Sequence, residues 1–88
     1  MPTGTIMVYG VADCEDTQRS RALLDRIQVP YTYVALEQDS EATEQVKGWN
    51  GGARKTPTIV FPDGRRLVEP SDTELEEATQ VEGTISPG

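Results

Sequence analysis

The stretch "TIMVYGVADCEDTQRSRALLDRIQVPYTYVAL", residues 5–36, decides the fold because it predicts a strand, a helix and a strand in turn. Residues 5–10 are apolar and rich in β-formers, which favours a buried strand. Leu23, Leu24 and Ile27 fall on one side of a helix predicted over residues 17–28, and the Val-Pro pair after it ends that helix. Residues 31–36 alternate and predict a second strand. Two strands joined by a helix form a right-handed parallel unit.

The next segment, "EQDSEATEQVKGWNGG", predicts a turn followed by a short helix. Ser40 is the expected N-cap, since its hydroxyl can accept a hydrogen bond from a free backbone N–H of the first turn. Ala42, Val46 and Trp49 form the apolar stripe of this helix, with Trp49 as its core anchor. The Asn-Gly-Gly sequence after Trp49 is expected to end it.

The remaining elements are a hairpin and a last helix. Residues 56–61 and 66–69 predict two strands around a tight turn with Asp-Gly at its centre. Ser71 and Glu74 have the spacing of a capping box, which predicts that the last helix begins there. The fold class is therefore α/β, with element order β-α-β-α-β-β-α and a four-stranded mixed sheet that carries helices on both faces.

The chain has 88 residues, which indicates one domain. We assign residues 1–80 to that domain. Residues 81–88 offer little to bury, so we expect them to form a flexible C-terminal tail.

Composition excludes several classes of function. The net charge of −7 argues against a nucleic-acid partner and against an anionic membrane surface. The chain has no histidine and one cysteine, so we expect neither a metal site nor an internal disulfide. An unpaired cysteine suits a reducing compartment, and no apolar run reaches the length of a membrane span. We therefore expect a cytoplasmic protein.

Cys14 is the candidate nucleophile because the predicted topology places it between the first strand and the first helix. Unpaired N–H groups and the helix dipole stabilise a thiolate there. Asp13, Glu15 and Asp16 act in the opposite direction, since each raises the pKa of a nearby thiol. The dipole contributes ~0.3–1 kcal/mol, and the carboxylates could cancel much of it. We expect a modestly activated thiol.

Thr56-Pro57 opens the predicted third strand. Proline cannot donate a hydrogen bond to a neighbouring strand, so at this position it marks an edge, a bend or a cis bond. A cis bond would turn the backbone N–H and C=O of Thr56 outward, where an extended thiol ligand could pair with them.

The strand-loop-Cys-helix, the later Thr-Pro and the acidic capped last helix resemble a glutaredoxin of the thioredoxin fold over about residues 5–80. The segments "WNGGARKTPTIVFPDGRRL" and "EPSDTEL" are most similar to short glutaredoxins of the mycoredoxin type. The resemblance implies that Pro57 is the family's cis-proline and that the Thr56 backbone pairs with a bound thiol. It also implies that Ser71 and Asp72 hold a carboxylate of glutathione or an equivalent ligand, and that the cofactor is a small thiol, glutathione or mycothiol.

The active-site sequence departs from the family pattern. Asp13 replaces the usual Trp or Tyr before the cysteine, and Glu69-Pro70 replaces the Gly-Gly before the last helix. The active site reads Cys14-Glu15-Asp16-Thr17, so Thr17 stands where a second cysteine would resolve the mixed disulfide. A monothiol reaction remains open, in which a second small thiol releases the first. The Thr17 hydroxyl could donate a hydrogen bond to the thiolate. Arg54 and Lys55, which precede Thr56, either line a solvated turn or hold a ligand carboxylate.

The sequence thus predicts a monomeric thiol–disulfide oxidoreductase that acts on mixed disulfides of proteins or small molecules. Cys14 and Thr17 are the candidate catalytic residues, and residues 54–57, 71 and 72 line the groove for the small thiol. Two alternatives remain: a redox-silent thioredoxin-fold module that binds a protein partner, and a dimeric carrier of an iron–sulfur cluster ligated by Cys14.

Overall fold

The computed structural model describes residues 5–83 and forms a three-layer α/β domain. Its elements in chain order are β1 (Ile6–Gly10), α1 (Glu15–Arg26), β2 (Tyr31–Ala35), the short 3₁₀ helix η1 (Leu36–Gln38), α2 (Ser40–Trp49), β3 (Thr58–Val60), β4 (Arg66–Val68) and α3 (Asp72–Gly83). The predicted order of strands and helices is confirmed, and η1 is the one described element that the sequence did not predict.

The four strands form one mixed sheet in the order β2-β1-β3-β4. β1 pairs with β2 in parallel, with Ile6 opposite Tyr31 and Gly10 opposite Ala35. β3 runs antiparallel to both β1 and β4, so the hairpin extends the sheet that the β-α-β unit begins. β2 is therefore an edge strand, next to the loop that carries Cys14.

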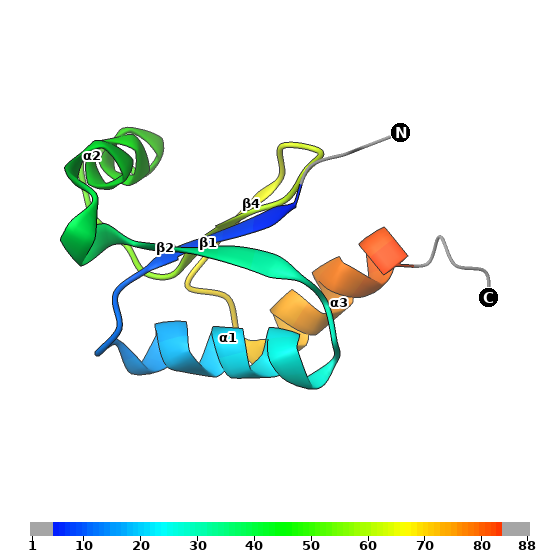
Figure 1. Cartoon of the computed structure of the whole chain (residues 1–88). Helices are drawn as coiled ribbons and strands as arrows, with labels where there is room; N and C mark the ends of the chain where they lie inside the picture. The colour runs from blue at the N-terminus through cyan, green and yellow to red at the C-terminus, as the bar shows by residue number, and fades with distance from the viewer. Residues whose placement is uncertain (1–4, 84–88) are drawn as a thin grey trace.

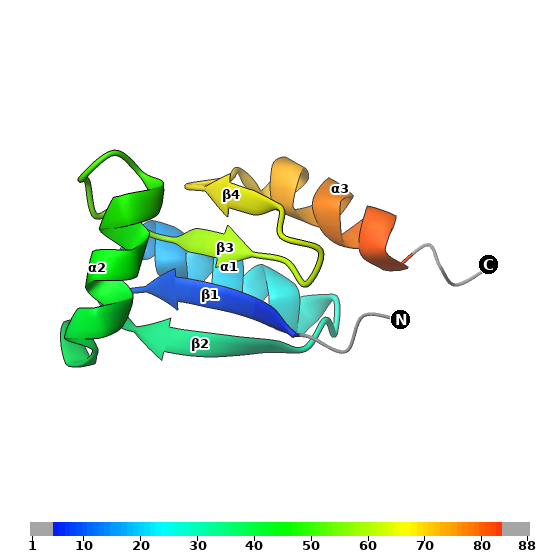
Figure 2. The same ribbon diagram turned by 90° about the horizontal axis from the view of Figure 1, so that it is seen from above.

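Helices cover both faces of the sheet, as predicted. α1 and α3 lie together on one face and α2 lies on the other (Figure 1). Seen from above, α2 crosses one end of the sheet, where β1 and β2 finish (Figure 2). Each face of the sheet packs against its helices in a separate hydrophobic core. The core under α1 and α3 consists of Ile6, Val8, Leu23, Leu24, Ile59, Phe61, Leu75 and Ala78, and the core under α2 of Tyr9, Leu36, Ala42 and Val46.

Helix α1 begins at Glu15, two residues before the predicted start, because Cys14 is its N-cap. The backbone of Cys14 is extended, with φ −90° and ψ 122°, and the carbonyl of Cys14 accepts the N–H of Gln18 at 3.0 Å. Glu15 and Asp16 therefore occupy the first turn, where negative charge stabilises a helix. The sulfur lies at the helix N-terminus as the sequence predicted.

The predicted N-cap of α2 was wrong. Asp39 caps this helix: its carboxylate accepts the N–H of Ala42 at 2.9 Å, and Ser40 is the first helical residue. The reason is the 3₁₀ turn just before it, which leaves Asp39 extended at φ −144° and ψ 93° and so in the conformation that a cap requires.

The hairpin and the last helix follow the sequence prediction with shorter strands. Gly64, at φ +94°, occupies the left-handed position of the turn, and its N–H bonds the carbonyl of Phe61 at 2.9 Å. Ser71 and Glu74 form the predicted capping box, in which each side chain accepts the backbone N–H of the other residue. α3 continues to Gly83, three residues into the expected tail, and residues 84–88 lie outside the described residues.

Candidate active site

The loop between β1 and α1 is held in place by three hydrogen bonds around Cys14. The N–H of Cys14 bonds the carbonyl of Val11 at 3.2 Å and closes a turn. The N–H of Ala12 donates to the Glu37 carboxylate at 3.1 Å, and the carbonyl of Ala12 accepts from the Gln18 side chain at 2.7 Å. Ala12 is thus bonded to η1 through its N–H and to α1 through its carbonyl, and the turn closed by Cys14 joins it to the sulfur.

Thr56 meets Cys14 from a segment that is 42 residues away in sequence. The Thr56 hydroxyl donates to the sulfur at 3.5 Å, and the thiol faces the carbonyl of Thr56 at 3.8 Å. The Thr56-Pro57 bond is cis, as predicted, and Pro57 is buried. Within residues 5–83 the N–H of Thr56 has no hydrogen-bond partner, while the carbonyl of Pro57 accepts the N–H of Glu69 at 2.9 Å.

This environment lowers the pKa of the Cys14 thiol. The hydrogen bond from the Thr56 hydroxyl is the largest cause, and partial burial of the sulfur opposes it by raising the pKa. The backbone N–H groups of Thr17 and Asp16 and the hydroxyl of Thr17 lower the pKa further. Hydrogen-bond donors thus outweigh burial, and the pKa is lowered although the sequence places three carboxylates around the sulfur.

Thr17 lies directly behind the sulfur and is fully buried. Its hydroxyl oxygen is out of contact with water and has no hydrogen-bond partner among the described residues. The same hydroxyl lies close enough to Cys14 to lower the thiol pKa. A buried hydroxyl without a partner is costly in a folded protein, and a thiolate at Cys14 would supply the missing acceptor.

Arg19 is a site residue that the sequence analysis missed. Its guanidinium pairs with Asp16 on the same helix, and its Nε lies 3.6 Å from a carboxylate oxygen of Asp72 at the start of α3. One cation therefore compensates two carboxylates near the N-termini of both helices. The pair with Asp16 has the three-residue spacing of helix ion pairs and was open to prediction, whereas the pair with Asp72 depends on the packing of α1 against α3.

The predicted ligand-binding residues fall into two groups. Ser71 and Asp72 are engaged by their own fold, since Ser71 belongs to the capping box and Asp72 faces Arg19. Within residues 5–83, the N–H groups of Asp72 and Thr73 have no hydrogen-bond partner.

Arg54 and Lys55 are exposed, and neither side chain has a hydrogen bond or ion pair within the part of the chain that the structure describes. They precede Thr56 directly and are free to meet an anionic ligand.

Comparisons with known proteins agree with this geometry. The family model described as glutaredoxin matches residues 6–67. The chain belongs to the glutaredoxin family. Two Mycobacterium tuberculosis proteins that carry a glutaredoxin name, Rv3198A of strain H37Rv and MT3292 of strain CDC 1551 / Oshkosh, are each 33% identical to this chain over 75 residues. That alignment covers 85% of this chain and 89% of either relative.

Solved structures confirm the thioredoxin-like fold of this glutaredoxin. The crystal structure of glutaredoxin (grx-1) from Archaeoglobus fulgidus superposes with a TM-score of 0.75 at 19% identity, over 89% of this chain and 88% of that one. The glutaredoxin from Methanosarcina mazei Go1 gives a TM-score of 0.66 at 21% identity, over 90% of this chain and 77% of that one. Family and fold together support a glutaredoxin-like function, and glutaredoxins generally use glutathione or a related thiol.

Two further findings apply to the described part of this glutaredoxin. No three side chains of the metal-binding types His, Cys, Asp and Glu gather closely enough to hold a metal ion there. None of the helices in residues 5–83 is both long enough and apolar enough to cross a membrane.

We predict that Thr56→Val raises the pKa of Cys14, because the variant keeps the shape of the side chain and loses the hydroxyl that donates to the sulfur. The pH dependence of iodoacetamide alkylation measures this pKa, and its midpoint should move to higher pH. Thr56→Ser retains the donor and serves as the control, so its midpoint should stay near that of the wild type. An unchanged midpoint in Thr56→Val would show that this hydrogen bond does not stabilise the thiolate.

Proposed function

We propose that this glutaredoxin is a monothiol thiol–disulfide oxidoreductase that reduces mixed disulfides between proteins and a small thiol such as glutathione or mycothiol. The observation that carries the proposal is the position of the Cys14 sulfur, at a helix N-terminus and 3.5 Å from a donating hydroxyl of Thr56. The chain has no second cysteine, so no internal thiol can resolve an intermediate.

The reaction has two displacement steps. The Cys14 thiolate attacks the small-thiol sulfur of the mixed disulfide; the protein thiolate leaves and takes up a proton. A second small thiol, as thiolate, then attacks the disulfide on Cys14 and leaves as the symmetric disulfide, which regenerates the Cys14 thiolate. In sum, the second small thiol is oxidised and the protein sulfur is reduced to a thiol. The first small thiol was already disulfide-bonded and passes from the protein through Cys14 to the second one.

Each predicted site residue has a role in this proposal. The hydroxyls of Thr56 and Thr17 hold the thiolate, and the free N–H of Thr56 pairs with the backbone of the small thiol. Where the small thiol is glutathione, Arg54 and Lys55 attract its carboxylates, and the free amides at the start of α3, next to Ser71 and Asp72, receive one of them. The proposal places the reaction in the cytoplasm, where reducing conditions suit an unpaired cysteine. In this proposal the domain of residues 1–80 acts as a monomer.

Exchange kinetics with several small mixed disulfides test this function. We expect turnover of a mixed disulfide in which glutathione or mycothiol is joined to another small thiol. We also expect iodoacetamide to alkylate Cys14 at pH 7 faster than it alkylates a model-peptide thiol. A thiol pKa at or above about 8.5, the value of free cysteine, together with no turnover of any mixed disulfide, would instead favour the redox-silent binding module.

A further inference from the structure

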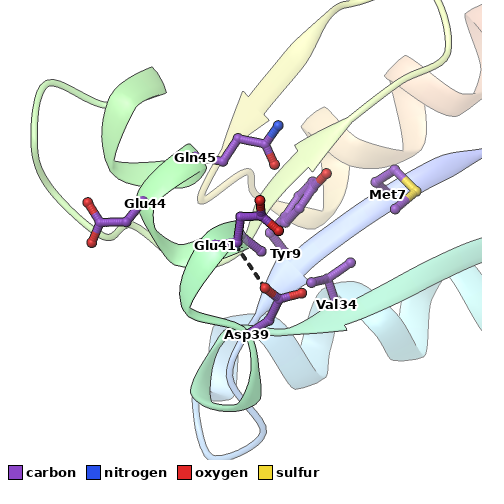
Figure 3. A pocket seen from close by; sticks show the side chains of 8 residues that line it. Met7, Tyr9, Val34, Asp39, Glu41, Glu44 and Gln45 are labelled. Atoms are coloured by element: carbon purple, nitrogen blue, oxygen red, sulfur yellow. Dashed lines mark hydrogen bonds between the residues drawn. The ribbon is translucent and has the colours of Figure 1, made fainter.

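A shallow groove lies on the face of the sheet that α2 covers. It has a volume of about 660 Å³, within the range in which proteins hold ligands. Figure 3 shows its parts: Met7 and Tyr9 project from β1 and Val34 from β2, and the first turns of α2 stand beside them. Met7 and Val34 are only partly buried. The groove therefore has an apolar floor that α2 leaves partly open to solvent.

The rim of the groove is acidic. Asp39, Glu41 and Glu44 line it, and all three are exposed. The carboxylates of Asp39 and Glu41 lie beside the floor, and Glu44 stands on the outer side of α2 (Figure 3). The Lys47 ammonium lies 3.6 Å from the Glu44 carboxylate, and no basic side chain of residues 5–83 lines the groove. With a net charge of −7 on the whole chain, this surface repels anions and attracts cations.

The groove is continuous with the surface that leads to Cys14. A second hollow runs along the edge strand β2 and η1, and it shares Val34 and Asp39 with the groove. Its other end is lined by Ala12, two residues before Cys14. A chain whose disulfide is held at Cys14 can therefore continue along β2 and reach the groove.

We infer that the groove docks the protein substrate through an apolar side chain flanked by lysine or arginine. The apolar side chain fills the floor between Met7 and Val34, and its basic neighbours pair with the carboxylates of the rim. An acidic or neutral segment would bury the same floor without compensating the rim charges. The reaction at Cys14 rests on the proposed function, whereas the binding to the groove does not require turnover.

The kinetic test uses two peptides that differ only in charge. Each carries one cysteine as a glutathione mixed disulfide, a linker of ten Gly/Ser residues that spans about 17 Å, and a leucine flanked by two lysines or by two glutamates. We expect the wild type to show a kcat/KM about tenfold higher for the lysine peptide at low ionic strength, and this preference should fall as salt is added. Equal kcat/KM values for the two peptides would overturn the inference.

A matched pair of variants separates the groove from the overall charge. Glu41→Gln/Glu44→Gln removes two rim charges, and Glu76→Gln/Glu77→Gln removes two exposed charges from α3 on the opposite face. The first double variant should lose most of the preference for the lysine peptide, and the second should keep it. An equal loss in both would assign the preference to net charge and contradict the groove. Both should turn over a small mixed disulfide at the wild-type rate.

Binding without turnover keeps this inference independent of the proposed function. The lysine peptide with its cysteine replaced by serine is titrated into ¹⁵N-labelled Cys14→Ser protein. Amide shifts should concentrate at Met7, Val34 and Glu41, and they should be absent with the glutamate peptide. Failure of all exchange with these shifts present would refute the oxidoreductase and leave the docking surface. Shifts located elsewhere, or none, would refute the docking surface.

Discussion

Replacement of Cys14 by serine is expected to abolish exchange while leaving the protein folded. A serine hydroxyl stays protonated at neutral pH, so it can neither attack a disulfide nor hold a small thiol. The chain has no other cysteine to take over the reaction. Turnover of a glutathione or mycothiol mixed disulfide should therefore fall to the rate measured without protein.

The same substitution should not destabilise the fold, and this separates chemistry from folding. Cys14 is the N-cap of α1, and its side chain makes no capping hydrogen bond. Serine is among the best N-cap residues, so the free energy of unfolding should stay equal or rise by about 0.5–1 kcal/mol. Urea unfolding followed by circular dichroism measures it. Exchange above background, or a clear loss of stability, would contradict this reading of the site.

The order of elements could be predicted because each depends on local signals. The β-α-β unit follows from apolar periodicity, and the hairpin follows from Asp63-Gly64 between two short apolar runs. The capping box of Ser71 and Glu74 could be predicted because four consecutive residues define it. The cap of α2 could not, because Asp39 and Ser40 are both good caps and the choice depends on η1, which has no clear signal of its own.

The main cause of the lowered pKa of Cys14 could not be predicted from neighbouring residues. The sequence places three carboxylates around Cys14, yet its pKa is lowered. The main donor, Thr56, lies 42 residues after Cys14 in the chain. Glu37, whose carboxylate accepts the N–H of Ala12, lies 25 residues after Ala12. Such partners meet only when the sheet is assembled. The position at a helix N-terminus therefore predicted a modestly activated thiol, and the donor that lowers its pKa most could not be named from the sequence.

Gly10→Ala is expected to cause the largest loss of stability among the substitutions described above. Gly10 ends β1 and is buried, and a Cβ added there would lie 2.6 Å from both Cγ2 and Oγ1 of Thr17. Thr17 is fully buried and cannot move away freely. Overpacking of this kind costs about 1–3 kcal/mol. Because Thr17 stands behind the sulfur, the variant should also change the pKa of Cys14.

A second glycine offers the matched control. Gly48 lies inside α2, is exposed, and would place an added Cβ more than 4 Å from any described atom beyond its two chain neighbours and the nearby backbone of α2. Gly48→Ala should therefore stabilise the protein by about 0.5–1 kcal/mol, because alanine is the better helix former. Urea unfolding of the two variants should thus give changes of opposite sign. Thr17→Ala should restore much of the loss when it is combined with Gly10→Ala, since it removes the two atoms that lie 2.6 Å from the new methyl group. Equal stability of Gly10→Ala and the wild type would show that Thr17 does not pack against β1 as described.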